Sequence, residues 1–169
     1  MWPFGRRQPD SPREQFKAGT RAIERGELRE GIELLEQVAE QEPDNVSAAV
    51  NLGAAYFTLG DQQAAAEQLE RARQHAPDNP KVLLNLAAAR SALDDLDGAI
   101  DLLLRILQID PQYRDCHYNL GIAYWRKGRI PEAMAELEME LALHPDHELA
   151  RQTAAQLRDR HGREGRNRQ

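Results

Sequence analysis

The sequence is poor in cysteine and in aromatic residues. Cys116 is the single cysteine among 169 residues, so neither an intrachain disulfide nor a zinc site made of several cysteines can form. This composition suits a protein that folds in a reducing cytoplasm, and we expect a cytoplasmic location. Aromatic side chains make up only 5% of the chain. Alanine and leucine abound whereas β-branched residues are few, which favours helices over strands.

Long apolar runs are also absent. No stretch approaches the roughly 20 apolar residues that span a bilayer. The N-terminal residues MWPFGRRQPD lack the apolar centre of a secretory signal. The stretch MWPFGRR has a composition suited to a membrane interface, but seven residues cannot anchor a protein alone.

Sequence motifs for catalysis and cofactor binding are missing. The chain contains no GxxxxGK[ST], GxGxxG, GxSxG or HExxH, the motifs that hold phosphates, dinucleotides, a serine nucleophile or a zinc ion. We therefore expect no enzymatic activity, no cofactor and no small-molecule substrate.

The net charge of −6 is unevenly distributed. Residues 1–13 carry +2 and residues 158–169 carry +3, which leaves −11 for residues 14–157. An acidic body repels nucleic-acid phosphates, and the scattered arginines of the basic tails would give only weak, salt-sensitive binding. The charge pattern thus disfavours a nucleic-acid partner.

An internal repeat of 34 residues organises the chain. The segment NLGAAYFTLGD at 51–61 returns as NLAAARSALDD at 85–95 and as NLGIAYWRKGR at 119–129. The units are 12–45, 46–79, 80–113 and 114–147, without insertions. Further columns repeat at the same interval: Pro43, Pro77, Pro111 and Pro145; Gly19, Gly53, Ala87 and Gly121; Gly31, Ala65, Ala99 and Ala133.

Each unit has the apolar spacing of two helices. In the second unit the spacing predicts helices over 46–59 and 62–75, separated at Gly60-Asp61 and ended by Pro77. Antiparallel helices approach closely only where a side chain is nearly absent, as at Gly53 and Ala65. One helical pair cannot bury both of its apolar faces, so the pairs must stack. The length predicts a single all-α domain.

The segments outside the repeats are interpreted as a cap and two tails. Residues 148–160 predict a capping helix that closes the stack with Leu149, Thr153, Ala154 and Leu157 on one face. Residues 1–11 and 161–169 are expected to be a flexible N-terminal tail and a disordered C-terminal tail, both basic.

The repeats resemble the tetratricopeptide repeat family across residues 12–147. This resemblance implies a right-handed α-solenoid whose first helices line a concave groove, and a non-catalytic scaffold or adaptor that binds a protein partner there. The matching residues are Leu52, Gly53, Tyr56, Ala65, Leu69, Ala72 and Pro77 in the second unit, and Leu120, Gly121, Tyr124, Ala133, Leu137 and Pro145 in the fourth.

The resemblance also implies which residues line the groove. An asparagine amide complements a peptide backbone group, so the three repeated asparagines can hold an extended segment. They can equally bond neighbouring helices of the stack, and the ligand can instead be an amphipathic helix. Tyr118 and Trp125 are the expected binding hot spots unless they pack against the next helix. The candidate groove residues are Asn51, Asn85, Asn119, Phe57, Leu84, Tyr118, Ile122 and Trp125.

Two alternative kinds of partner follow from the same residues. Some members of the family clamp the C-terminal carboxylate of chaperones with Lys and Asn at the fifth and ninth places. Here these places hold Phe16, Thr20, Val50 and Ala54, which lack the required positive charge. Self-association into homo-oligomers through the solenoid surfaces remains an alternative to capture of another protein.

One residue departs from the packing pattern. Glu140 stands where a small apolar residue normally packs, and an unpaired buried carboxylate is costly. We expect Glu140 to be exposed or to pair with a cation such as Arg151 of the cap.

Three segments superficially suggest chemistry. HPDH, from His144 to His147, has the spacing of two metal ligands but falls in the turn between repeats, so no metal site is expected. Cys116 and His117 are adjacent on a helix and point about 100° apart, which makes a poor nucleophile pair. DDLDG at 94–98 lacks the later ligands of a calcium loop and is interpreted as a turn followed by a helix start.

Overall fold

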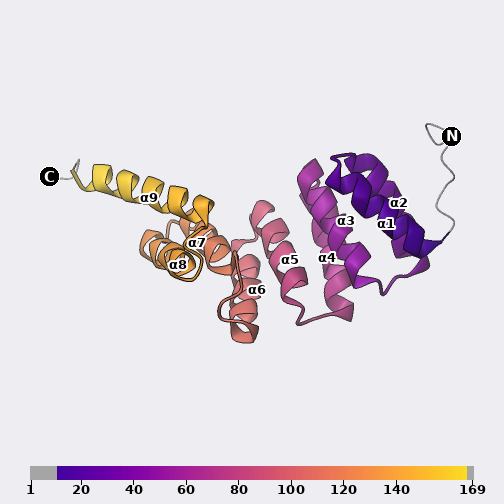
Figure 1. The fold of residues 1–169 in the computed structure, drawn as a ribbon. Coiled ribbons are helices and arrows are strands. Elements are labelled where there is room, and N and C mark those ends of the chain that lie inside the picture. The colour runs from indigo at the N-terminus through magenta and orange to yellow at the C-terminus, as the bar shows by residue number, and fades with distance from the viewer. Residues whose placement is uncertain (1–10, 167–169) are drawn as a thin grey trace. The chain divides into compact units, whose positions relative to one another are not determined.

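The computed structural model describes residues 11–166, and within them the chain is entirely helical (Figure 1). The side chains of residues 160–166 are not described. The helices are α1 Pro12–Glu24, α2 Leu28–Gln41, α3 Val46–Leu59, α4 Gln62–His75, α5 Pro80–Ala92, α6 Leu96–Ile109, α7 Cys116–Arg126, α8 Ile130–Leu143 and α9 Glu148–Arg166.

The turns inside the four helical pairs share one backbone feature. Gly26, Gly60 and Gly128 have φ values of 80°, 90° and 73°, and Asp94 holds the equivalent turn with a φ of 68°. Glycine adopts this left-handed conformation without a steric penalty. The predicted helices at 46–59 and 62–75 are therefore confirmed as α3 and α4, with the break at Gly60.

Close contact between paired helices depends on the glycine column. A Cβ atom added to Gly53 would lie 2.5 Å from Cγ of Leu69, and one added to Gly121 would lie 2.9 Å from Cγ of Leu137. Both leucines are fully buried. The absence of a side chain at these two glycines thus lets α4 approach α3 and α8 approach α7.

The chain divides into two compact units, with the boundary between Ala89 and Arg90 inside α5. In a stack of repeats each pair contacts only its neighbours, so the apolar residues do not need to form one continuous core. The core cluster of the first unit contains Ile32, Leu35, Ala39, Leu52 and Ala55. That of the second unit contains Ala133, Leu137, Ala150, Ala154 and Leu157.

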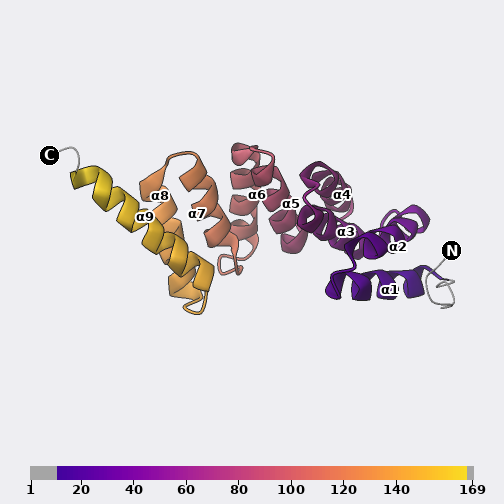
Figure 2. The same cartoon turned by 90° about the horizontal axis from the view of Figure 1, so that it is seen from above.

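The C-terminal helix α9 packs against α8 in the second unit (Figure 2). It buries Ala150, Thr153, Ala154 and Leu157. Leu149 is 57% exposed, so the prediction that it lies on the packed face is wrong. Residues 150, 154 and 157 follow the i, i+4, i+7 spacing of one helix face, and residue 149 is turned away by about 100°.

The extent of α9 corrects a second expectation. The helix continues to Arg166, so residues 161–166 are helical and not a disordered tail. No proline interrupts this stretch, and each added residue extends the helix by one backbone hydrogen bond. The expectations for residues 1–10 and 167–169 lie outside the described residues. None of the helices in the described part combines the length and apolar character needed to cross a membrane.

Candidate functional site

Asparagine and apolar side chains share the first helices of the repeats in the first unit. Asn51 of α3 donates from Nδ2 to Thr20 Oγ1 of α1 at 3.1 Å, and Asn85 of α5 donates to the Lys81 carbonyl at 2.7 Å. Phe57 is 40% exposed at the C-terminal end of α3, although Leu52 of the same helix is fully buried. We call Asn51, Phe57, Leu84 and Asn85 the first-helix face of this unit.

The second unit presents a corresponding set on α7. Asn119 donates from Nδ2 to the Asp115 carbonyl at 2.7 Å, and Ile122 is half-buried one turn further along. Tyr118, Asn119, Ile122 and Trp125 form the first-helix face of the second unit. Asn51 joins two helices, which is the intramolecular role that the sequence left open, whereas Asn85 and Asn119 bond backbone carbonyls four residues earlier.

The two expected hot spots are partly used in packing. Tyr118 and Trp125 are half-buried and lie against the core cluster that α9 completes with Ala150, Ala154 and Leu157. The Tyr118 ring also lies 4.8 Å from the His147 ring between centroids. Both aromatic residues therefore help to position the cap helix α9.

Glu140 is a fully buried carboxylate that holds the N-terminus of α7. Its Oε1 accepts the backbone N–H of Asp115 at 3.1 Å, and its Oε2 accepts that of Tyr118 at 3.2 Å. Asn45 and Asp61 cap α3 and α4 with their own side chains, whereas no local side chain caps α7. Glu140 supplies this cap from the neighbouring helix α8, where the positive end of the α7 dipole also favours a negative charge.

The burial of Glu140 excludes the expected alternative of an exposed side chain, and Arg151 is not its partner. Arg151 instead bonds Glu148, three residues earlier on the exposed face of α9. The local backbone adapts to the carboxylate: α7 begins at Cys116, and Asp115 before it has a left-handed φ of 68°. Helix termini offer unpaired N–H groups, so a carboxylate can be buried there without an arginine or lysine partner.

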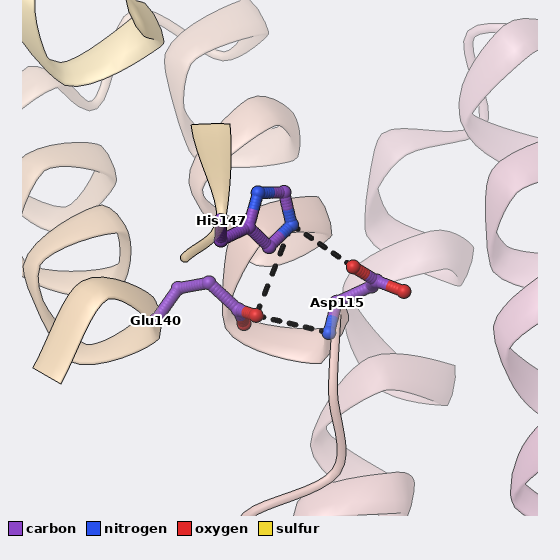
Figure 3. A group of neighbouring side chains, drawn as sticks. All are labelled: Asp115, Glu140 and His147. Carbon is purple, nitrogen blue, oxygen red and sulfur yellow. Dashed lines mark hydrogen bonds and ion pairs between the residues drawn. The ribbon is translucent and has the colours of Figure 1, made fainter. Parts of the chain in front are cut away.

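His147 approaches the same carboxylate from the turn before α9 (Figure 3). Its Nε2 atom lies 2.9 Å from Asp115 Oδ1 and 3.8 Å from Glu140 Oε1. Its Nδ1 atom accepts the backbone N–H of Ala150 at 3.2 Å, so His147 caps α9. The side chain is 7% exposed, and its Nε2 atom is buried without a hydrogen bond of good geometry. We call Asp115, Glu140 and His147 the α7–α9 cluster.

Family models for the tetratricopeptide repeat match most of the chain. One matches residues 16–80, and another matches residues 58–111 and again 92–157. The chain belongs to the tetratricopeptide repeat family. Tetratricopeptide repeats are protein-interaction scaffolds and are typically non-catalytic, and membership supports this class of function here.

Solved structures support the helical-repeat solenoid fold. A crystal structure of the MamA protein matches with a TM-score of 0.78 at 23% identity, over 89% of this chain and 82% of that chain. A second MamA structure gives 0.72 at 28% identity, over 89% and 87%. YrrB, described as a TPR protein with an unusual peptide-binding site, gives 0.77 at 21% identity, over 85% and 74%. Among curated proteins, none matches the sequence.

The environment of Cys116 in this tetratricopeptide repeat chain explains why the thiol is not a nucleophile. It is fully buried, donates to the Leu103 carbonyl at 3.3 Å, and has its pKa raised to about 12, first by burial and then by the charge of Glu140. His117 turns instead to Glu136, 2.6 Å away. The two side chains have separate partners, and the thiolate needed for reaction is strongly disfavoured.

The DDLDG segment, residues 94–98, is a turn followed by a helix start, as predicted. Asp95 accepts the backbone N–H of Gly98 and caps α6. Asp94 and Asp97 pair with Arg126 and Lys127, at 2.8 Å and 2.6 Å, at the end of α7. These two ion pairs connect the third repeat to the fourth and account for the position of both carboxylates.

Proposed function

We propose that the first-helix faces bind an extended peptide segment of a protein partner. The observation that carries this proposal is the exposure of Phe57. Leu52 and Ala55 of the same helix are buried to 1% exposure or less, whereas the Phe57 ring leaves 40% of its surface in water. Aromatic side chains of this kind supply much of the binding energy in protein interfaces.

The asparagine amides support an extended ligand. Each bond described above uses one N–H of Asn51, Asn85 or Asn119. A primary amide has two N–H groups and an oxygen acceptor, so one donor and one acceptor remain on each side chain. The internal bond orients the amide, and the remaining pair complements the N–H and C=O of a peptide backbone.

A binding comparison tests this proposal. Peptides are selected from a random library on the full chain, and their affinities are measured by fluorescence anisotropy. We expect Phe57→Ala and Asn85→Ala each to weaken binding by about tenfold or more, which is the loss of a hot-spot contact. Leu104→Ala on α6 is the matched control, because Leu104 is 41% exposed and lies on a second helix of a repeat. Equal affinities for all three variants would exclude the first-helix faces as the site.

The form of the bound ligand is a separate outcome. An extended peptide adds little helical signal to the circular dichroism spectrum of the complex, whereas an amphipathic helix would add the signal of its own folding. If Phe57→Ala loses binding and the complex of the unsubstituted chain gains helical signal, the site stays as proposed but its ligand is an amphipathic helix and not an extended peptide.

Self-association is the second candidate function. Leu149 at the start of α9 is 57% exposed and Met139 on α8 is 49% exposed, and large apolar side chains outside the core can form contacts between copies. Light scattering of the full chain at two concentrations distinguishes the cases. A mass that rises with concentration, and that falls back to one chain in Leu149→Lys, would favour assembly over peptide capture.

A further inference from the structure

We propose that Asp115, Glu140 and His147 bind a divalent transition-metal ion, and that the ion fastens the cap helix α9 to α7 and α8. The three residues are distant in the sequence and come from the turn before α7, from α8 and from the turn before α9 (Figure 3). One ligand atom from each lies within 4.8 Å of the others. This site lies apart from the proposed peptide contacts of the asparagines and does not depend on them.

The distances suit a small ion. Ligand atoms around a tetrahedral Zn²⁺ with bonds of about 2.1 Å lie about 3.4 Å from one another. The distances from His147 Nε2 to Asp115 Oδ1 and to Glu140 Oε1 are 2.9 Å and 3.8 Å, on either side of that value. Small side-chain rotations would therefore bring all three atoms into bonding range.

The unbonded nitrogen gives a second indication. His147 Nε2 is buried and points at two carboxylates, with which it makes ion-pair contacts but no hydrogen bond of good geometry. Buried polar atoms almost always have a well-aligned hydrogen bond, so a nitrogen that has only ion-pair contacts leaves its direct ligand position open. The cluster also brings two carboxylates together around one imidazole, and a divalent cation would balance their charge. An imidazole nitrogen with carboxylate oxygens is a donor set for zinc or a similar transition metal more than for Mg²⁺ or Ca²⁺.

The surroundings provide further features of a metal site. The backbone N–H groups of Asp115 and Tyr118 fix the Glu140 carboxylate and leave a lone pair on its oxygens. The Asp115 carboxylate is 47% exposed, which gives the ion a path from solvent and room for a water as fourth ligand. Metal binding at Nε2 moves the ring proton to Nδ1 and breaks the bond from Ala150 N–H, so we expect moderate rather than extreme affinity.

Zinc titration of the untagged full chain, stripped with EDTA, tests the site. Isothermal calorimetry with Zn²⁺ is expected to show one ion per chain, and Co²⁺ is expected to give the absorption bands of a tetrahedral site. Zn²⁺ should also raise the melting temperature, because it binds only the folded chain. Mg²⁺ at the same concentration should do neither.

Two substitutions test whether the zinc ion binds at this cluster. His147→Asn removes Nε2 but keeps a side chain that caps helices well, and Asp115→Asn removes a charge from a half-exposed carboxylate. Each should weaken Zn²⁺ binding at least about tenfold while the apo protein still folds. His75→Asn, at the exposed C-terminal end of α4, is the matched control and should bind as the unsubstituted chain does.

Three results would overturn the proposal. The first is no Zn²⁺ binding, which would make the cluster a purely structural set of ion pairs. The second is binding that His147→Asn and Asp115→Asn leave unchanged. The third is binding that the control His75→Asn abolishes, which would place the ion on another surface of the chain.

Discussion

Glu140 shows how a single buried charge can be compatible with a helical core. Its two oxygens accept two backbone N–H groups that the start of α7 would otherwise leave without partners. Charge-assisted hydrogen bonds of this kind are roughly twice as strong as neutral ones. If one partner is removed, the other stays buried without a hydrogen bond, which destabilises the folded chain. Glu140 is thus a structural residue of α7 although it belongs to α8.

Replacement of Glu140 tests this structural role. Glu140→Gln keeps the shape but places an amide N–H₂ against one of the backbone donors. We expect the free energy of unfolding to fall by about 2–4 kcal/mol, measured by urea denaturation in the presence of EDTA. Glu138→Gln is the matched control, since Glu138 is 58% exposed and pairs only with Arg158. A loss for Glu140→Gln no larger than that of the control would contradict the assigned role.

Cys116 makes a pH-dependent contribution to stability. Burial raises the pKa of its thiol to about 12 in the folded chain, whereas an exposed thiol ionises near about 8.5. Between these values the unfolded chain loses the proton and the folded chain keeps it. The contribution is therefore fully present below about pH 8.5 and is lost as pH rises toward 12.

The pH dependence of unfolding tests this contribution. Above about pH 9 the free energy of unfolding should fall by up to about 1.4 kcal/mol per pH unit from this group. Urea denaturation at pH 8 and pH 10.5 measures the fall, and Cys116→Ala should show a smaller one. Tyr56 has its pKa raised to about 12, mainly by burial, and contributes equally in both proteins. Identical slopes would show that the thiol does not ionise on unfolding in this range.

At the scale of helices, the glycine column determines how closely each pair packs. Gly53→Ala would place a methyl group 2.5 Å from Cγ of Leu69, which is buried and has little room to move. Overpacking costs about 1–3 kcal/mol and the gain in helix propensity is about 1 kcal/mol, so we expect a net loss of up to about 2 kcal/mol.

A neighbouring substitution isolates the packing effect. Ala54→Gly changes the next residue of α3, which is exposed, and measures helix propensity alone. It should also destabilise, by about 1 kcal/mol, although it removes a methyl group. If Gly53→Ala stabilises the protein while Ala54→Gly destabilises it, the Gly53 contact is not the one that limits the approach of α3 and α4.

Helix positions were predictable from the sequence, but individual side-chain partners were not. Periodic apolar residues and the Gly60 break determine α3 and α4 locally, so a single chain is enough to place them. The partner of Glu140 is a pair of backbone N–H groups 25 and 22 residues away, and backbone donors leave no sequence signal. The pattern identified Glu140 as anomalous, but only packing shows what the carboxylate does.

The α7–α9 cluster was missed for a related reason. Sequence reasoning compared His144 with His147, because two histidines at a short spacing are a familiar metal motif. In the structure His144 bonds the Gln112 carbonyl and comes no nearer than 4.0 Å to Glu140 Oε1, whereas His147 lies 2.9 Å from Asp115. Cap helix α9 brings these residues together by tertiary packing, and no local spacing records that.

At the scale of the whole molecule, the repeats give a scaffold whose first helices present similar residues in each unit. Both helices of a pair contribute to the packing, with fully buried Leu52 on α3, Leu69 on α4 and Leu137 on α8. The first helices carry the repeated asparagines and the exposed ring of Phe57. These asparagines and this exposed ring are the basis of the proposed capture of a peptide.

Photo-crosslinking from position 57 tests that capture most directly. A photoreactive phenylalanine analogue replaces Phe57 in one protein and Leu104 in another, and each is irradiated with a peptide selected on the unsubstituted chain. We predict that position 57 crosslinks to the peptide in a one-to-one complex and that position 104 does not. Crosslinking from position 104 alone would contradict peptide capture by the first helices and place the ligand on the second helices.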